Sequence, residues 1–316
     1  MSGTSSDAID AALVRFSDSG CELISTLAAT FDAPILDRIN RAVDGTADRI
    51  NDISELDVLL AQAFADTALL LKDQAGVDQI TAIGSHGQTV RHQPSGCLPY
   101  TVQLGNGARI AALTGITTVS DFRTADLALG GQGAPLVPAF HRAIFSDPDE
   151  NRVIVNIGGI ANVTVLHRKD RPSGFDTGPG NTLMDHWFRQ HQPGIYDENG
   201  TWAQSGTCLP KLLRTLLECD YFSRPPPKST GLEEFNLDWL NTYLVGDERP
   251  EDVQATLAEL TAESISHSIK TNAPDTDAVY LCGGGANNEH LVNQLNNRLA
   301  PLSLYTSDRL GLPVDW

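Results

Sequence analysis

The chain has 316 residues, a formal net charge of −18 and a sequence pI of about 4.6. This length favours two domains over one, and a hydrophobic content of 41% is enough for buried cores. Such an acidic chain is a poor partner for nucleic acids or anionic membrane surfaces, and no apolar run reaches the length of a membrane-spanning helix.

The five cysteines are widely scattered and include no CxxC pair. Neither a zinc site nor a disulfide framework is therefore indicated. Because disulfides are rare in reducing compartments, this pattern predicts a cytoplasmic protein.

The first ten residues contain the first candidate site. Gly3, Thr4 and Ser5 allow a tight turn whose N–H groups face an anion, and Asp7 and Asp10 are carboxylates spaced three apart. Mg²⁺ takes few carboxylates and keeps several waters, so this pair suits the hydrated metal of a nucleotide triphosphate. A flexible polar N-terminus is the alternative interpretation.

The next segments alternate helices with strands, which indicates an α/β fold. Apolar residues recur at helical spacing from Ile53 to Ala68, and Gly76 ends that helix. Strands are predicted at residues 77–83, 100–104 and 116–119, with a helix from 105–107 to Leu113 between the last two.

A glycine-rich segment at residues 129–135 separates two halves, so we expect domains at 1–128 and 129–316. In the second half, the β-rich runs 153–157 and 161–166 are joined by Gly158 and Gly159, which predicts a hairpin. Further elements are predicted in order: a rigid proline segment at 225–227, a helix at 251–270, a strand at 278–282 and a helix at 289–299.

Four glycine-bearing loops follow, or are able to follow, a strand: 3–10, 156–162, 176–181 and 283–287. One such loop is weak evidence, since most Gly-Gly pairs are simply turns. Four in one chain favour a site that handles phosphate. The motifs of P-loop NTPases, protein kinases, serine hydrolases and dinucleotide-binding βαβ units do not occur.

Asp176 is the best candidate for a reacting group. Pro179 is expected in the first turn of a helix that runs through Met184 and Trp187. A carboxylate near a helix start either caps the helix or acts as a general base that faces a nucleotide γ-phosphate. The spacing leaves both interpretations open.

Ser85 and His86 lie at the end of a predicted strand, where open α/β sheets bind ligands. His86 is either an acid or base or, more simply, a hydrogen-bonded structural histidine. Arg123 follows the strand at 116–119 and either grips the oxygens of a sugar or carboxylate or pairs with Asp121 or Asp126.

These strings closely resemble the anhydro-N-acetylmuramic acid kinase family, and the resemblance runs essentially from end to end. The matching segments are MSGTSSDAID (1–10), SHGQT (85–89), DFRTADLALGGQGAPLVP (121–138), VNIGGIANV (155–163), FDTGPGN (175–181) and GLPVDW (311–316).

The resemblance implies the fold of the sugar kinase, Hsp70 and actin superfamily, in which two ribonuclease H-like α/β domains close over ATP. It implies a first phosphate loop, a second phosphate hairpin and a loop against adenosine. The cofactor-binding residues would be Gly3, Thr4, Ser5, Ser6, Asp7, Ala8, Ile9 and Asp10 in the first, Gly158, Gly159 and Asn162 in the second, and Gly283, Gly284 and Gly285 in the third.

The resemblance also implies the activity. Family enzymes open 1,6-anhydro-N-acetylmuramic acid with water and phosphorylate O6, which gives N-acetylmuramic acid 6-phosphate and ADP during peptidoglycan recycling. Asp176 matches the catalytic base, with Asp7 and Asp10 near Mg²⁺ and the small-molecule sugar held by Thr4, Ser85, His86 and Arg123. A homodimer is expected. Two alternatives are a kinase of an open-ring sugar and a non-catalytic, ATP-binding regulatory protein of actin-like fold.

Some features depart from the family pattern. Ala8 stands where the family has Gly, which would cost about 1 kcal/mol if that position needs a positive φ. Asn106 stands where an Asp is expected. The chain starts inside the first motif and stops at Trp316, so we expect it to lack the family's apolar first strand and a Glu-bearing helix of the sugar site.

Overall fold

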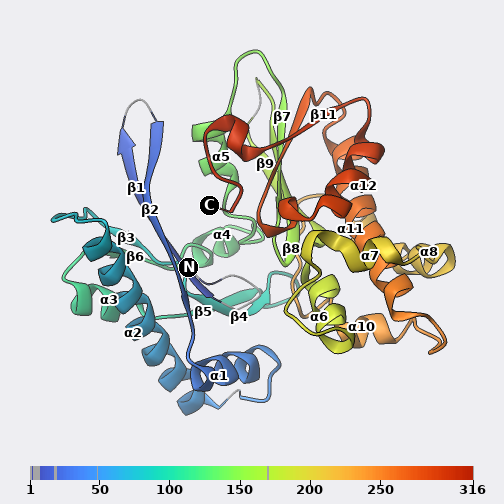
Figure 1. Cartoon of the computed structure of the whole chain (residues 1–316). Helices are drawn as coiled ribbons and strands as arrows, with labels where there is room; N and C mark the ends of the chain where they lie inside the picture. The colour runs from blue at the N-terminus through green and yellow to red at the C-terminus, as the bar shows by residue number, and fades with distance from the viewer. Residues whose placement is uncertain (1, 3–7, 18–19, 48, 169–170, 316) are drawn as a thin grey trace. The chain divides into compact units, whose positions relative to one another are not determined.

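The computed structural model describes residues 2, 8–17, 20–47, 49–168 and 171–315, and it is a mixed α/β structure (Figure 1). The chain divides into two compact units, residues 1–133 (unit 1) and 134–316 (unit 2). This division falls a few residues after the domain boundary expected at residue 128, within the same glycine-rich segment.

Unit 2 is built on one sheet of five strands, counted over residues 134–168 and 171–315, in the order β11-β10-β7-β8-β9. The strands are β7 (Arg152–Ile157), β8 (Ile160–Leu166), β9 (Ser173–Pro179), β10 (Ala278–Cys282) and β11 (Ser303–Thr306). β7, β8 and β9 form an antiparallel meander, whereas β10 is parallel to β7 and β11 to β10. Numbered within the unit, the order is 3-2-1-4-5, which is the ribonuclease H-like arrangement that the resemblance implies.

Both faces of this sheet are covered, which explains why residues 153–155 of β7 are apolar without alternation. Val153 and Val155 face the larger core together with Leu257 and Ile265 of α11, while Ile154 faces a smaller cluster with Phe145 of α5. Figure 1 shows α11 and α12 on one side of the sheet and α5 on the other. The helices are α5 (Pro138–Phe145), α6 (Thr182–His191), α7 (Thr201–Ser205), α8 (Pro210–Leu217), α9 (Asp220–Ser223), α10 (Leu237–Asn241), α11 (Pro250–Asn272) and α12 (Glu289–Leu299), with short 3₁₀ turns at Glu198–Gly200, Gly284–Asn287 and Ser307–Leu310.

Unit 1 contains three two-stranded sheets within its described residues. The pairs are β1 (Ala8–Ser17) with β2 (Gly20–Thr30), β3 (Ile83–Gly84) with β6 (Thr118–Val119), and β4 (Gln88–Gln93) with β5 (Tyr100–Leu104). The helices are α1 (Ala33–Val43), α2 (Ile50–Gln74), α3 (Gly107–Thr114) and α4 (Thr124–Ala128). Leu56, Leu60 and Phe64 of α2 form the centre of the core with Ile9 of β1 and Ile39 of α1.

Most predicted elements are confirmed, including the long α2 and α11, the hairpin β7–β8, and β5, β10 and α12 at their predicted bounds. The strand predicted at 77–83 is wrong in extent, because only Ile83 and Gly84 pair, and they pair with β6. Most side chains between Asp78 and Ala82 are exposed, so this segment has no sheet face to bury.

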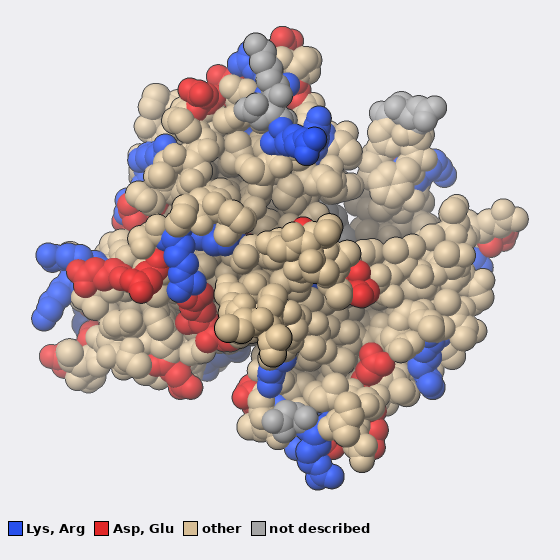
Figure 2. All heavy atoms as spheres, turned by 180° about the vertical axis from the view of Figure 1, so that it is seen from behind, with Lys and Arg blue, Asp and Glu red and all other residues tan. Residues whose placement is uncertain are grey.

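No helix among the described residues is long and apolar enough to cross a membrane. The five cysteines are all free thiols. On the face that Figure 2 shows, Lys and Arg side chains are interspersed with Asp and Glu side chains. Among the described residues, this face therefore shows no continuous basic surface, in keeping with the net charge of −18.

His141 of α5 predicts a specific sensitivity to acid. Its Nδ1 lies 2.9 Å from Thr164 Oγ1 of β8, the residue is 5% exposed, and burial lowers the pKa of the imidazole from 6.5 to about 4. Between these two values the unfolded chain binds the proton and the folded chain does not, so stability falls as the pH falls.

Between pH 7 and pH 5 the free energy of unfolding should fall by about 2 kcal/mol less in His141→Asn than in the unchanged protein, because the variant lacks this titrating group. Urea unfolding of both proteins at the two pH values measures this difference. An equal loss of stability in the variant would contradict the prediction.

Candidate functional site

Three of the predicted glycine loops meet at one edge of the unit 2 sheet. β7, β9 and β10 run in the same direction, so the residues after each strand emerge at the same edge. Gly180 N donates to Gly159 O at 2.9 Å, and Asn181 N donates to Gly158 O at 2.8 Å. The hairpin turn and the segment after β9 are therefore joined main chain to main chain.

These contacts require glycine at particular positions. A Cβ on Gly180 would overlap the carbonyl oxygen of Gly158, and a Cβ on Gly285 would overlap the Ile157 side chain. Gly283 has a φ of +81°, which L side chains rarely adopt. The glycines at this edge thus let three loops approach closely.

A threonine of α11 supports the same segment from behind. Thr261 Oγ1 donates to the carbonyl oxygens of Pro179 and Gly180, at 3.1 Å and 3.0 Å, and this residue is 1% exposed. Asn181 Nδ2 donates to Ile157 O at 3.3 Å. The sequence offered no signal for Thr261, because it lies inside a long helix without a recognisable motif.

Asp176 lies inside β9 and not at a helix start, so the predicted capping role and the predicted helical position of Pro179 are both wrong. Pro179 is the last residue of β9, and α6 begins only at Thr182. Asp176 is 4% exposed, and its Oδ2 accepts a hydrogen bond of 3.0 Å from Thr230 N. The carboxylate is therefore held by a main-chain donor far away in the sequence.

The backbone of Asp176 is held as firmly as its carboxylate. Asp176 N donates to Lys228 O at 3.1 Å, and Tyr221 OH donates to Asp176 O at 2.7 Å. Burial and the charges of Asp176 and Glu234 raise the pKa of the Tyr221 phenol, which keeps it a donor. None of these partners was predicted, since only the folded chain brings residues 221–230 against β9.

A row of polar side chains crosses the sheet at the level of Asp176. Cys282, Asn156, Asn162 and Asp176 are successive register partners on β10, β7, β8 and β9, so their side chains share one face. Cys282 Sγ donates to Asn156 Oδ1 at 3.9 Å, and burial raises the pKa of this thiol to about 12. Asn162 Oδ1 is buried without a hydrogen-bond partner among the described residues, which suits a ligand donor.

In unit 1, two of the predicted sugar-binding residues are in direct contact. Arg123 Nε donates to His86 Nε2 at 2.8 Å, and Arg123 Nη1 donates to Gly133 O at 2.8 Å. Burial and the charge of Arg123 lower the pKa of His86 to about 4, and its Nδ1 lies 2.9 Å from Gly87 O. Both contacts suit a neutral imidazole, and the role of His86 at the sugar stays a prediction.

Ser85 lies beside this pair. Its main-chain N donates to Val119 O at 2.8 Å, which extends the pairing of β3 with β6, and the residue is 7% exposed. Asp121 has a φ of +58°, and Asp126 Oδ2 accepts from Gly133 N at 2.7 Å. The segment that carries Arg123 is therefore fixed at both ends.

The first predicted phosphate loop lies mostly outside the described residues, namely Gly3, Thr4, Ser5, Ser6 and Asp7. Ala8, Ile9 and Asp10 belong to β1, where Ile9 is buried and Asp10 is exposed. Their predicted roles in binding the cofactor and the metal stay predictions. No group of three or more His, Cys, Asp or Glu side chains in the described part of the chain is placed to hold a metal ion.

The two departures from the family pattern have simple structural outcomes. Ala8 is the first residue of β1, where it pairs with Thr30 of β2, so it has a place in an extended strand. Asn106 caps α3, since its Oδ1 accepts from Arg109 N at 3.0 Å. Asn and Asp are similarly favourable at the N-cap position, so α3 keeps its cap without the carboxylate charge.

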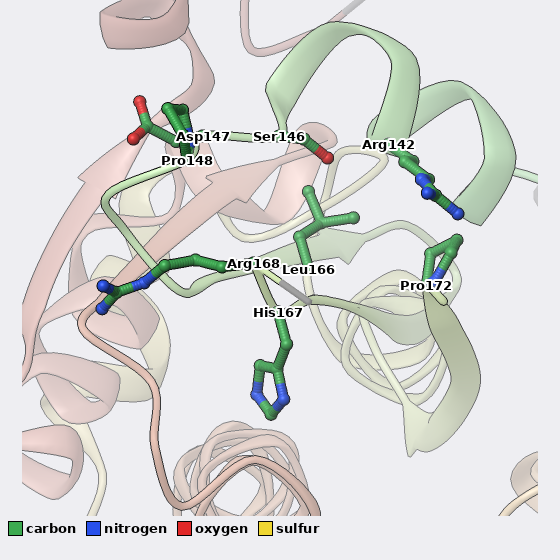
Figure 3. Close-up of a pocket in the computed structure, with 8 residues that line it drawn as sticks. All are labelled: Arg142, Ser146, Asp147, Pro148, Leu166, His167, Arg168 and Pro172. Carbon is green, nitrogen blue, oxygen red and sulfur yellow. The ribbon is translucent and has the colours of Figure 1, made fainter. Parts of the chain in front are cut away.

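A pocket of unit 2 lies at the opposite edge of the sheet (Figure 3). Leu166 at the end of β8 forms its floor, and Leu166 pairs with Arg152 at the start of β7. Arg142 and Arg168 point away from each other in Figure 3, and Arg168 pairs with Asp277 at 2.9 Å. This pocket is therefore separate from the edge that carries the glycine loops.

A ribonuclease H-like sheet with glycine turns at its carboxyl edge and a buried carboxylate nearby is typical of the sugar kinase, Hsp70 and actin superfamily. The whole chain, residues 1–316, matches the family described as anhydro-N-acetylmuramic acid kinase. Curated proteins of that name are 49% identical in Coxiella burnetii (strain Dugway 5J108-111) and 46% identical in Nitrosomonas europaea. The alignments cover 100% of this chain and 86% and 88% of those proteins. The chain belongs to the anhydro-N-acetylmuramic acid kinase family.

Solved structures match more distantly. A ROK family glucokinase from Streptomyces griseus is 10% identical with a TM-score of 0.39, over 90% of this chain and 86% of that one. The topology of unit 2 described above does not depend on this likeness.

The close contact at Gly180 predicts a contrast between two glycines. Gly180→Ala places a methyl group against the Gly158 carbonyl, and neither main chain is able to move without breaking hydrogen bonds, so we expect a loss of about 2 kcal/mol or more. Gly284→Ala meets nothing within 4 Å and is expected to change stability by less than about 0.5 kcal/mol. Thermal unfolding measures both, and equal melting temperatures for the two variants would contradict the prediction.

Proposed function

We propose that this chain is an ATP-dependent kinase that opens 1,6-anhydro-N-acetylmuramic acid with water and phosphorylates O6, which yields N-acetylmuramic acid 6-phosphate and ADP. The observation that carries the proposal is the family match over all 316 residues. The buried Asp176 supports it, because this carboxylate shares a sheet face with the hairpin asparagines Asn156 and Asn162.

In the proposed reaction, Asp176 accepts a proton from the water that attacks the anomeric carbon. The bond between C1 and O6 breaks, and O6 forms a bond to the γ-phosphorus as the bond from that phosphorus to the β,γ-bridging oxygen breaks. Asp176 has the properties that this role needs: it is positioned through its backbone and its Oδ2, and it is largely shielded from water. Positioning and electrostatic stabilisation supply most of the catalysis in phosphoryl transfer.

The other predicted site residues receive roles within this proposal. Gly158, Gly159 and Asn162 bind phosphate, Gly283, Gly284 and Gly285 lie against adenosine, and Thr4, Ser85, His86 and Arg123 bind the sugar, with His86 orienting Arg123. Residues 3–10 are assigned to phosphate as well, although residues 3–7 lie outside the described part of the chain. Mg²⁺ would neutralise phosphate charge near Asp7 and Asp10, but no step above is assigned to it, since Asp7 lies outside the described residues.

We further propose that the protein acts in the cytoplasm, where ATP is available, during peptidoglycan recycling, and that it forms a homodimer. Two alternatives from the sequence remain for comparison: a kinase of open-ring N-acetylmuramic acid and a non-catalytic ATP-binding protein. The assay below separates all three.

The first test is the release of ADP with Mg-ATP and 1,6-anhydro-N-acetylmuramic acid. Open-ring N-acetylmuramic acid and a reaction without sugar are the controls. We expect turnover with the anhydro sugar alone. Turnover with the open-ring sugar alone would favour the alternative kinase, and ATP binding without sugar-dependent ADP would favour the binding protein.

Asp176→Asn tests the proposed base. The amide oxygen of Asn is still able to accept from Thr230 N, so the fold and the affinity for ATP should be kept. Because general-base catalysis contributes typically about 10²–10⁴-fold, we expect kcat to fall by at least that range. Steady-state kinetics and calorimetric titration with ATP measure the two effects. A variant that turns over at the normal rate would remove Asp176 from the role of base.

A further inference from the structure

Lys228 is a buried cation that the proposed reaction does not yet use. It follows the exposed proline segment 225–227 and is 7% exposed. Its Nζ donates to Tyr221 O at 3.0 Å and lies 4.6 Å from the centre of the Tyr221 ring. Lys228 is therefore fixed at both its main chain and its ammonium group.

Lys228 Nζ also donates to Phe222 O at 3.5 Å, whereas its other hydrogen bonds lead to Asp176. Lys228 O accepts from Asp176 N, and Thr230 N, two residues later, donates to Asp176 Oδ2. Tyr221, which binds the ammonium group with its carbonyl and ring, donates its hydroxyl to Asp176 O. The ammonium group thus connects the two segments that hold the carboxylate.

The pKa of Lys228 is lowered overall, and Asp176 is one of the charged groups that act on it. Burial and the nearby Arg224 lower the pKa of Lys228, whereas Glu234 and Asp176 raise it. Glu234 already pairs with Arg224 at 3.2 Å and accepts from Thr230 Oγ1 at 2.9 Å. The attraction between Lys228 and Asp176 is mutual, so the ammonium group favours the charged form of the carboxylate.

Packing alone does not explain a lysine at this position. Burying an ammonium group costs free energy, and an apolar side chain of similar length would cover the Tyr221 ring without that cost. The cost is offset if the charge serves a neighbouring group, and Asp176 is the proposed reacting group among its neighbours.

We propose that Lys228 is a positioning residue that holds the Asp176 carboxylate in place and keeps it ionised as the base. The inference deepens the proposed kinase reaction and rests on it for its catalytic part only. Its electrostatic part is tested separately, because the titration of the Asp176 carboxylate is followed without substrate.

The test that does not depend on activity is a ¹³C NMR titration of the aspartate carboxyl groups, with the Asp176 signal assigned from its loss in Asp176→Asn. Lys228→Met removes the charge and keeps the length of the side chain. We expect the titration midpoint of Asp176 to rise by about one pH unit in this variant and to stay unchanged in Lys228→Arg. Lys211→Met, which alters an exposed lysine of α8, is the matched control.

Kinetics then tests the catalytic part. In Lys228→Met we expect kcat with the anhydro sugar to fall at least tenfold. The acid limb of the pH profile of kcat/KM should move to higher pH by the same amount as the titration midpoint of Asp176. Lys228→Arg should restore most of the rate. If the Met variant does not fold, Lys228→Gln keeps a donor for the Tyr221 carbonyl without the charge and gives the same comparison.

The outcomes separate the two proposals. An unmoved Asp176 midpoint in Lys228→Met or Lys228→Gln overturns the inference, even if stability falls. A moved midpoint in a protein that shows no turnover with the anhydro sugar supports the coupling and overturns the proposed function.

Discussion

The contact between the turn after β7 and the residues after β9 is the constraint on which the candidate site depends. Gly180 and Asn181 donate to the main chain of Gly158 and Gly159, and a side chain at residue 180 would not fit between them. Because this contact fixes the end of β9, it also fixes the height of Asp176 on the sheet. The position of the carboxylate is thus set by glycines that lie beyond the end of its strand.

The same constraint determines how Asp176 meets its hydrogen-bonding needs. A carboxylate that is 4% exposed must find donors within the protein, since leaving it unpaired would be very costly. β9 is the edge strand of the sheet, so its outer side is open to the segment that carries Lys228 and Thr230. The edge that another protein would need to shield against aggregation serves here to hold a functional side chain.

The fold was predictable where local signals agree with each other. The apolar run of β10 and the helix α12 appear at their expected bounds. In the structure β10 is buried and the Asn288 side chain caps α12 by accepting from Leu291 N. Pro179 misled the prediction, because proline suits both the first turn of a helix and the end of an edge strand. The sequence does not tell which strands lie at an edge, since that depends on pairing with distant residues.

The sites show the same limit. His86 and Arg123 were identified, and Arg123 was expected either to grip the oxygens of a sugar or carboxylate or to pair with Asp121 or Asp126, its neighbours in the sequence. The contact with His86 was not foreseen. The parallel pairing of β3 with β6 instead brings His86 to Arg123 Nε. This bond requires a neutral imidazole, because a protonated ring would direct an N–H group at the guanidinium. The bond and the lowered pKa of His86 both correspond to a neutral ring. They favour a role in orienting Arg123 rather than a role as an acid or base.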